Sequence, residues 1–249
     1  MLVFVLNAGS SSLKYQLINA KTAELKASGL VERIGIDGIL KHEIGENKKL
    51  TFELQIPTHK EAIELVLRIL TNDETKVINS IKEIQAIGHR IVHGGEFFKE
   101  STIVTPDVIE KIEQLIPLAP LHNPANIMGI KICQELMPKV PNVAVFDTAF
   151  HQSIPEVAYK YAIPNEFLSK KHIRLYGFHG TSHKYVSEKA SEYLKSQNKP
   201  YQNIITVHLG NGCSITAVKD GTCIDTSMGF TPISGLIMGT RSGDIDASV

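Results

Sequence analysis

The sequence predicts an α/β protein built from two related halves, and three observations support this prediction. Short apolar runs suited to buried strands alternate with amphipathic stretches of helical period. A strand–turn–strand–turn–strand pattern occurs twice, at residues 3–30 and 204–226. The 249 residues, 43% of them hydrophobic, can bury one large core or two modest ones. The alternative for the repeat is that any two glycine-containing β-hairpins look alike.

The N-terminal part of the chain is expected to form strands and then one helix. Five short runs are typical of strands: residues 2–6, 12–18, 25–34, 38–44 and 50–56. Thr58 and Glu61 have the spacing of a capping box, in which two side chains satisfy backbone N–H groups at a helix start. Apolar residues then recur at helical spacing, which predicts a helix to about Leu70.

Proline marks the starts of the next two helices. A strand is expected at residues 84–92, and Thr105-Pro106 then has the order of an N-cap followed by a first helical proline. Pro117 should end that helix. Asn123-Pro124 repeats the pattern and predicts a helix to about Leu136.

The second half is expected to begin after a buried strand at residues 142–146. Residues 150–175 are rich in proline and tyrosine and read as an irregular junction between domains. Thr181 or Ser182 is expected to cap a helix that runs to about Leu194. Two further strands are predicted at residues 203–209 and 213–218.

The composition excludes several classes of protein. Lys plus Arg and Asp plus Glu number 26 each, so no net charge favours nucleic acid or an acidic membrane. No apolar run approaches the roughly 20 residues of a membrane span, and the N-terminus lacks the features of a signal peptide. Three scattered cysteines without CxxC spacing indicate reduced thiols. We therefore expect a cytoplasmic protein that binds neither nucleic acid nor membrane.

The segment LNAGSSSLK, residues 6–14, is the first candidate for a binding site. The backbone N–H groups of a Gly/Ser hairpin turn can converge on one anion. Ser10 and Ser12 add hydroxyl donors, and Ser12 and Lys14 should share a face of the pleated strand. Asn7 can orient a hydroxyl or a metal-bound water. The turn suits a phosphate group, although the same composition is typical of an ordinary solvated turn.

Several common catalytic motifs are absent from the sequence. There is no GxxxxGK[ST] loop, no HRD or DFG motif and no GxSxG elbow, which argues against a P-loop enzyme, a protein kinase and a serine hydrolase. The pairs His89/His93 and His179/His183 have i,i+4 spacing but lack the glutamate of HExxH, which argues against a zinc hydrolase. A nucleotide enzyme of this sequence needs a different phosphate grip.

Other polar residues follow predicted strands or precede a helix. Arg90 lies near the end of a strand that runs into Gly94-Gly95, a pair that would let a ligand approach the backbone. Asp147 follows a buried strand, His179 precedes a helix, and Arg241 lies in a glycine-flanked loop. Such a set suits phosphoryl transfer, in which positive groups surround the transferred phosphoryl. The alternative interpretation is that the arginines form surface ion pairs and that His179 only caps a helix.

These residues lie in stretches that closely resemble the acetokinase family, within the actin, sugar-kinase and heat-shock-chaperone ATPase superfamily. The matching stretches are VLNAGSSSLKYQL, GHRIVHGG, PLAPLHNPAN, VAVFDTAFH, YGFHGTSHKYV, VHLGNGCS and GTRSGDID. The resemblance implies two related domains of the ribonuclease H-like or actin-like ATPase fold. Residues 1–150 would form the N-terminal domain and residues 151–249 the first part of a nucleotide-binding domain that is incomplete here.

The resemblance also implies an activity: reversible transfer of the γ-phosphoryl of ATP to acetate, with Mg²⁺ or Mn²⁺, by a cytoplasmic homodimer. It implies catalytic roles for Asp147, His179 and Arg241, a metal ligand at Asn7, ATP contacts at Ser10, Ser12, Lys14, His208, Leu209, Gly210, Asn211 and Gly212, and substrate contacts at Arg90, Val92, Leu121, Phe178 and Pro232. Acetate is already ionised near neutral pH. Asp147 is therefore expected to orient groups rather than accept a proton.

Two alternatives remain open at this point. The first is a propionate or butyrate kinase of the same family. The second is a non-catalytic acyl- or phosphate-binding remnant, because the family's sequences continue beyond GTRSGDID into the rest of the nucleotide domain. These 249 residues alone are expected to be poorly stable, since half a domain exposes apolar edges, and not to turn over ATP.

Overall fold

The computed structural model describes residues 1–45 and 48–248 and is mixed α/β, which confirms the predicted class. Its contacts divide the chain into two compact units. The first unit joins residues 1–91 to 101–145, and the second joins residues 92–100 to 146–249. The compact units are thus not separated by one cut in the chain. The domain division at residue 150 stays a prediction.

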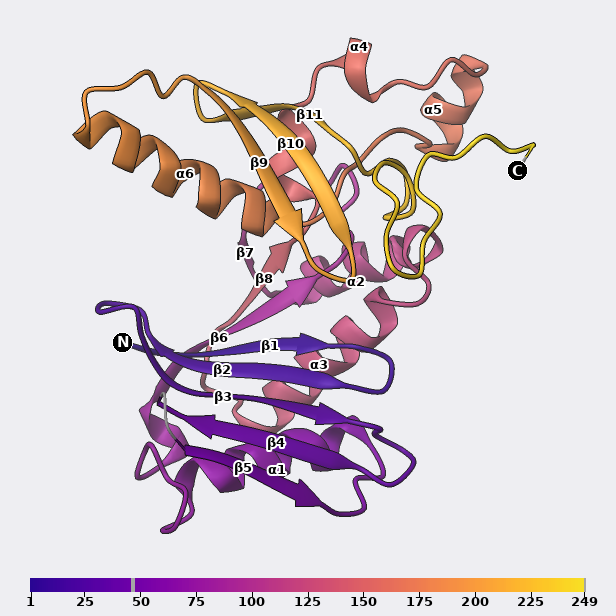
Figure 1. Ribbon diagram of the computed structural model, residues 1–249. Helices are drawn as coiled ribbons and strands as arrows, with labels where there is room; N and C mark the ends of the chain where they lie inside the picture. The colour runs from indigo at the N-terminus through magenta and orange to yellow at the C-terminus, as the bar shows by residue number, and fades with distance from the viewer. Residues whose placement is uncertain (46–47, 249) are drawn as a thin grey trace. The chain divides into compact units, whose positions relative to one another are not determined.

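The first unit is organised around a large sheet (Figure 1). Among the described residues it has eight strands in the order β5-β4-β3-β2-β1-β6-β8-β7. Strands β1 to β5 form an antiparallel meander, and β6 runs parallel to β1. The bounds are β1 Leu2–Ala8, β2 Leu13–Asn19, β3 Glu24–Glu32, β4 Ile39–Ile44, β5 Lys48–Glu53, β6 Ile84–Ile91, β7 Thr102–Ile103 and β8 Asn142–Phe146. The strands predicted for this part of the chain are therefore confirmed.

Three helices complete the first unit among its described residues: α1 His59–Thr71, α2 Pro106–Gln114 and α3 Asn123–Leu136. The Thr58 side chain caps α1 by accepting from the N–H of Lys60 at 3.1 Å. The Thr105 side chain caps α2 in the same way, by accepting from the N–H of Val108. The predicted start of α3 is one residue late, because Asn123 is already helical and His122 occupies the N-cap position.

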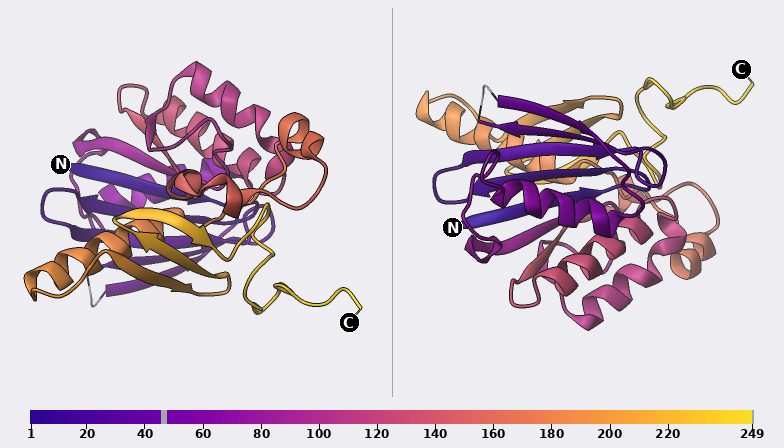
Figure 2. Two further views of the ribbon diagram at one scale, coloured as in Figure 1. Left: turned by 90° about the horizontal axis from the view of Figure 1, so that it is seen from above. Right: turned by 90° about the horizontal axis from the view of Figure 1, so that it is seen from below.

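The core of the first unit lies between the sheet and the helices α1 and α3, which pack side by side (Figure 2). It contains strand residues such as Phe4, Leu6, Leu13 and Leu17 and helix residues such as Val66 and Leu70. Side chains alternate along β2, so Leu13, Tyr15 and Leu17 are buried while Lys14 and Gln16 are exposed. The alternation thus turns Lys14 toward the open face of the sheet.

His89 on β6 is buried in the first unit and makes its folding sensitive to acid. Its Nε2–H donates to the Asn142 side-chain oxygen at 2.7 Å, and burial lowers the pKa of His89 to about 4. The unfolded chain binds the proton near pH 6.5. The unfolding free energy should therefore fall as the pH drops from about 6.5 to about 4, by about 3 kcal/mol for this residue. Urea unfolding across that range measures the slope.

The matched variant for this prediction is His89→Gln. Glutamine keeps an N–H donor for Asn142 but cannot take up a proton. The variant should therefore lose less stability than the parent between about pH 7 and about pH 4. Equal slopes for the two proteins would show that His89 does not couple folding to acid.

The second unit contains a smaller sheet and one long helix. Among the described residues its sheet has three antiparallel strands in the order β11-β10-β9: β9 Asn203–Leu209, β10 Cys213–Lys219 and β11 Thr222–Thr226. Helix α6, Gly180–Ser196, packs against β9. Residues 150–175 are less irregular than predicted, because they include the short helices α4 Glu156–Tyr159 and α5 Asn165–Lys171.

The predicted cap of α6 is wrong. The helix begins at Gly180, and His179, rather than Thr181 or Ser182, occupies the N-cap position. His179 adopts a left-handed conformation, φ 58° and ψ 21°, which turns the chain into the helix earlier than the hydroxyl pattern suggests. The Ser182 hydroxyl instead shares a hydrogen bond with His208 at 2.9 Å.

The predicted repeat is present in the backbone. Strands β1 to β3 and strands β9 to β11 each form a three-stranded antiparallel meander. Residues 9–12 form the first hairpin loop of one meander, and residues 210–212 form that of the other. That the two loops act on one phosphate chain stays a prediction.

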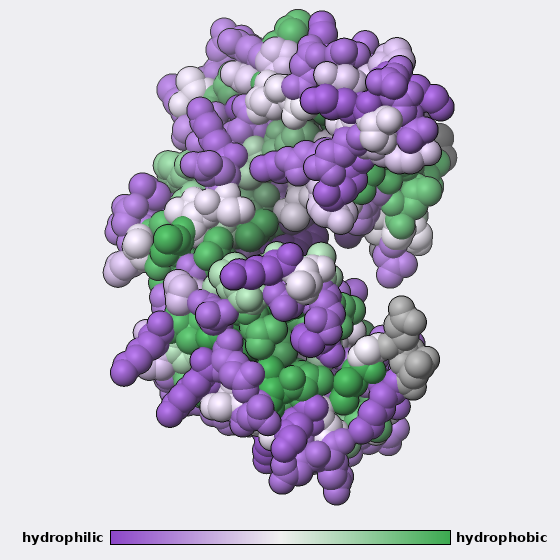
Figure 3. All heavy atoms as spheres, turned by 90° about the vertical axis from the view of Figure 1, so that its left-hand side faces the viewer, coloured by the Kyte–Doolittle hydropathy of each residue, from purple (hydrophilic) through white to green (hydrophobic). Residues whose placement is uncertain are grey.

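The surface agrees with the balanced charge of the sequence. Figure 3 shows hydrophilic residues over much of the visible face, with apolar residues exposed between them. Within residues 1–45 and 48–248, no helix combines the length and apolar character needed to cross a bilayer.

Candidate active site

The first hairpin loop is held by side chains from two helices. Within the loop, the N–H of Gly9 donates to the carbonyl of Ser12 at 2.8 Å. His59 of α1 contacts the Gly9 carbonyl at 2.7 Å, and Asn126 of α3 donates to the Ala8 carbonyl at 2.8 Å. A Cβ on Gly9 would lie 2.9 Å from Ser12 Oγ, so a larger residue here would have to displace the Ser12 hydroxyl. The backbone of the predicted anion site is thus fixed by folding.

Asn7 and Lys14 are brought together by strand register. They are direct partners across β1 and β2, and both line a cavity of about 390 Å³ on the first unit. Ser10 is exposed, and Ser12 is half-buried at the loop, one residue before β2 begins. The structure thus places the amide, the amine and the hydroxyls that the sequence singled out around one end of one hairpin.

The residues present do not form a metal centre by themselves. In the described part of the chain, no group of three His, Cys, Asp or Glu residues gathers as metal ligands. Mg²⁺, however, usually keeps several waters and takes one or two protein oxygens together with substrate phosphates. The amide oxygen of Asn7 fits one ligand of a metal that arrives with a nucleotide.

Arg90 and Leu121 are the two predicted substrate contacts in the first unit. Arg90 is half-buried on β6, next to the buried His89. Leu121 precedes α3 and is 76% exposed, so it is not part of the unit's core.

In the second unit, Val92 and Phe178 pack together, while their contact with substrate stays a prediction. They form a buried cluster with Met228 and Met238, against which Cys213 packs. The sequence did not indicate that Met228 and Met238 belong to this cluster, because an isolated apolar residue in a loop gives no sign of which residues it packs against. Pro232 is half-buried, and its carbonyl accepts a hydrogen bond from Arg241 Nη1 at 3.0 Å.

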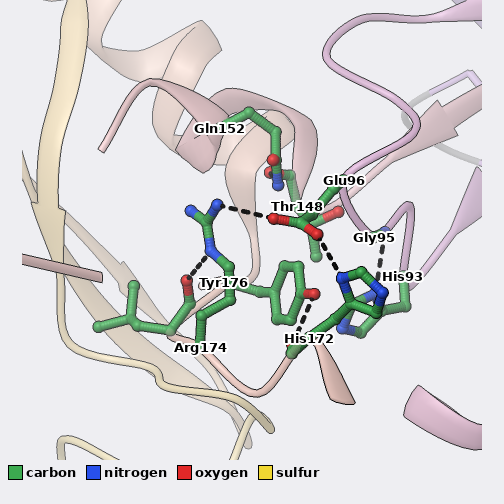
Figure 4. A network of polar contacts seen from close by, with 9 residues as sticks. His93, Gly95, Glu96, Thr148, Gln152, His172, Arg174 and Tyr176 are labelled. Atoms are coloured by element: carbon green, nitrogen blue, oxygen red, sulfur yellow. Dashed lines mark hydrogen bonds and ion pairs between the residues drawn. The ribbon is translucent and has the colours of Figure 1, made fainter. Parts of the chain in front are cut away.

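Residues 92–100 are tied to the second unit by a network around Glu96 (Figure 4). The Glu96 carboxylate contacts His172 Nδ1 at 2.7 Å and Arg174 Nη1 at 3.5 Å. The Arg174 guanidinium is buried and lies 3.6 Å from the centre of the Tyr159 ring. The Tyr176 hydroxyl donates to the His172 carbonyl at 2.8 Å. This network holds the segment that carries Val92.

Gly94 makes a close contact inside the second unit. Its N–H donates to the Thr148 hydroxyl at 3.0 Å, and a Cβ at this position would lie 2.9 Å from the Phe146 ring. The glycine therefore makes room for the Phe146 side chain, and the approach of a ligand to the Gly94-Gly95 backbone stays a prediction.

Asp147 and His179 are linked through the start of α6. Asp147 is buried, and its carbonyl accepts from the N–H of Gly180 at 2.8 Å. A Cβ on Gly180 would lie 2.3 Å from that carbonyl oxygen, so the contact requires glycine. The left-handed conformation of His179 costs about 1–3 kcal/mol in a non-glycine residue and is common at functional sites.

His179 and Arg241 converge on the second hairpin loop. A Cβ built at Gly212 would lie 3.1 Å from Arg241 Nη1 and 3.2 Å from His179 Cε1. The His208 ring stacks on the His179 ring with centroids 4.1 Å apart. Leu209, Gly210 and Asn211 are exposed at the strand end and loop. The structure thus gathers a guanidinium, an imidazole and the loop backbone at one place.

Sequence reasoning considered His183 only as a metal partner of His179 and missed Ser214. Ser214 and His183 are buried, and the Ser214 hydroxyl lies 2.8 Å from His179 Nδ1 and 2.7 Å from His183 Nε2. The i,i+4 spacing therefore places both histidines within hydrogen-bond distance of the same Ser214 hydroxyl. That spacing was the available signal, but nothing local pointed to Ser214 as the partner.

Several known proteins are similar to this chain in sequence and in structure. The model of the acetokinase family matches residues 2–249. Acetate kinase of Thermotoga maritima is 56% identical over 250 residues, which cover 100% of this chain and 62% of that protein.

Two solved structures extend the comparison. The crystal structure of Porphyromonas gingivalis acetate kinase has a TM-score of 0.93 at 47% identity and covers 99% of this chain. A propionate kinase from Francisella tularensis has a TM-score of 0.90 at 48% identity, also over 99% of this chain. In each case this chain spans 62% of the other protein's length. The chain belongs to the acetokinase family.

Proposed function

We propose that the protein carrying this chain is an acetate kinase, which transfers the γ-phosphoryl of ATP to acetate and forms acetyl phosphate and ADP reversibly. The observation that carries this proposal is the convergence of His179 and Arg241 on Gly212. Phosphoryl transfer needs such positive and hydrogen-bonding groups around the equatorial oxygens. The 56% identity to an acetate kinase supports acetate as the acceptor.

The proposed chemistry rests on charge neutralisation and positioning. Acetate and the γ-phosphate are both anions, so their approach must be offset by positive charge. Arg241 supplies this at the phosphoryl group, and Arg90 binds the acetate carboxylate with its planar fork. Asp147 orients neighbouring groups, since acetate has no proton to lose near neutral pH. The hairpin loops at residues 9–12 and 210–212 bind the phosphates through backbone N–H groups.

A divalent metal, Mg²⁺ or Mn²⁺, is proposed to arrive with ATP and to neutralise phosphate charge, with Asn7 as one oxygen ligand. We also propose that the protein works as a homodimer in the cytoplasm. Light scattering of the purified protein tests the dimer.

The direct test is acetyl phosphate formation from ATP and acetate, trapped as hydroxamate, together with the intact mass of the native protein. Activity in a product longer than 249 residues supports the proposal. A native 249-residue product that forms no hydroxamate would favour the non-catalytic remnant.

Propionate is the second candidate acceptor, because a propionate kinase matches this chain with a TM-score of 0.90. If Val92 lines the methyl site, its side chain leaves little room beyond two carbons. One methylene is worth about 1–3 kcal/mol in such a pocket. We therefore expect kcat/KM to fall by about 10- to 200-fold from acetate to propionate. Initial rates with acetate, propionate and butyrate measure the series, and a preference for butyrate would overturn the acetate assignment.

A matched pair of variants locates this selectivity. Val92→Ala enlarges the proposed methyl site and should raise the propionate-to-acetate ratio of kcat/KM. Val207→Ala makes the same change at an exposed position of β9 and should leave the ratio unchanged. Equal ratios in both variants would exclude Val92 from the methyl site.

A further inference from the structure

The buried face of the small sheet in the second unit is polar, which is unusual. Thr206 on β9 and Ser214 on β10 are 3% and 0% exposed. On the other face, Ile205, Val207 and Leu209 are exposed. Buried hydroxyl groups require hydrogen-bond partners. The partners of Thr206 and Ser214 are histidines.

These groups form one continuous chain of hydrogen bonds. His179 Nδ1 lies 2.8 Å from Ser214 Oγ, and Ser214 Oγ lies 2.7 Å from His183 Nε2. His183 Nδ1 lies 2.8 Å from Thr206 Oγ1. His183 is 1% exposed, and burial lowers its pKa to about 3, so it is neutral near pH 7 and carries one ring proton.

Ser214 must donate its own proton to one of the two histidines, because no other acceptor of this buried hydroxyl is found among the described residues. Proton counting then leaves two arrangements of this chain. In the first, Thr206 donates to His183 Nδ1, His183 Nε2–H donates to Ser214, and Ser214 donates to His179 Nδ1. In the second, every donor is reversed, so His179 Nδ1–H donates to Ser214 and His183 Nδ1–H donates to Thr206. The two differ in where His179 holds its proton.

Thr206 decides between the two arrangements. Among the residues that the structure describes, its hydroxyl has no hydrogen-bond partner other than His183 Nδ1. In the second arrangement the buried Thr206 proton would have no acceptor, which is costly. In the first arrangement each proton of the chain has an acceptor. The first arrangement is therefore favoured, and it leaves His179 Nδ1 as an acceptor.

The opposite edge of the His179 ring faces the second hairpin loop. A Cβ built at Gly212 would lie 3.3 Å from His179 Nε2 and 3.1 Å from Arg241 Nη1. The stacked His208 ring, itself bonded to Ser182 at 2.9 Å, fixes the plane of the His179 ring. An Nε2–H at this edge is thus directed toward the loop where the phosphoryl group is proposed to bind.

We propose that Ser214 and His183 are positioning residues that hold His179 as the neutral Nε2–H tautomer, so that His179 acts on the transferring phosphoryl as a hydrogen-bond donor rather than as a cation. The part about phosphoryl transfer rests on the proposed function. The part about the tautomer rests only on the hydrogen-bond chain within the second unit.

The test is ¹⁵N NMR of histidine-labelled protein near pH 7, in which the two ring nitrogens of a fixed neutral tautomer have well-separated shifts. The His179 signals among the ten histidines are assigned from their loss in His179→Asn. The parent protein should show a protonated Nε2 and an unprotonated Nδ1. A protonated Nδ1, as in the reversed tautomer or an imidazolium, would overturn the proposal.

Two isosteric variants on β10 separate this role from general packing. Ser214→Ala removes the hydroxyl between the two histidines and should give averaged His179 shifts. Thr216→Val removes a buried hydroxyl two residues along the same face, one that bonds Thr226 at 2.8 Å, and should leave His179 unchanged. His183→Gln keeps an N–H donor at the position of Nε2 and should preserve the tautomer. Unchanged His179 shifts in folded Ser214→Ala would contradict the proposal.

Kinetics complete the test. Ser214→Ala should lower kcat for acetyl phosphate formation by about 10- to 100-fold, as expected when an outer partner of a functional histidine is lost, with smaller changes in KM. A fixed tautomer in a parent protein that forms no acetyl phosphate would overturn the proposed function and leave the positioning inference standing. An averaged tautomer in an active parent protein would overturn the positioning inference and leave the proposed function standing.

Discussion

Replacing Arg241 by alanine is expected to lower kcat for acetyl phosphate formation by about 10²–10⁴-fold. Arg241 Nη1 is anchored on the Pro232 carbonyl at 3.0 Å and lies 3.1 Å from the Cβ position of Gly212. The permanent charge is thereby held at the second hairpin loop, where it would offset negative charge as the phosphoryl group is transferred. KM should change less than kcat, because this charge matters most in the transition state. Hydroxamate-trapped initial rates measure both.

Two further variants control for this result. Lys219→Ala removes a positive charge from an exposed position of the same unit and should keep near-parental kcat. Arg241→Lys keeps the charge but loses the planar fork, so its kcat should fall between those of the parent and Arg241→Ala. Near-normal turnover in purified, folded Arg241→Ala would remove the proposed role of this residue.

Gly180→Ala is expected to disturb both stability and activity, although Gly180 carries no functional group. The added methyl would lie 2.3 Å from the Asp147 carbonyl oxygen and 3.1 Å from Phe150 Cβ. The start of α6 must then move away from Asp147. Overpacking of this kind costs about 1–3 kcal/mol of unfolding free energy. Because His179 directly precedes Gly180, a shift of about 1 Å should also lower kcat by about 100-fold.

Gly239→Ala is the matched control for this prediction. A Cβ at Gly239 meets no atom within 4 Å, so the same substitution should leave the unfolding transition unchanged. Thermal unfolding and initial rates of the two variants are compared under the same conditions. If Gly180→Ala unfolds and turns over like the parent, the close contact between α6 and Asp147 is not required.

Local patterns in the sequence predicted most of the secondary structure, because their causes are local. The alternation in β2 follows from the pleat of a strand, and the start of α1 follows from one side-chain hydroxyl at Thr58. The two glycine-containing hairpins were found in the same way. Each of these features depends on residues within a few positions of one another.

The errors arose where distant residues decide a local choice. Thr181 and Ser182 looked like helix caps, but the contact of Gly180 with Asp147 and the conformation of His179 start α6 earlier. The sequence also did not show that the missing side chain of Gly94 accommodates Phe146. Neither Asp147 nor Phe146 is adjacent in sequence to the glycine that it contacts.

The candidate site shows the same division. His179 and Arg241 were singled out from their motifs, and the structure brings both against Gly212. Ser214 was not singled out, since a serine in a strand has no local mark of function, and His183 was noticed only for its spacing from His179, as a possible metal pair. Their role depends on the packing of α6 against the small sheet.

By itself, the sequence determined which chemical groups are available, which segments become strands and helices, and where the two glycine-containing loops fall. Only the tertiary structure decided which of those groups share a hydrogen bond, and therefore on which nitrogen His179 holds its proton. The physical reason is the distance along the sequence over which each effect acts. Pleating and capping act over a few residues, whereas the proton position at His179 depends on Ser214, His183 and Thr206 meeting through folding.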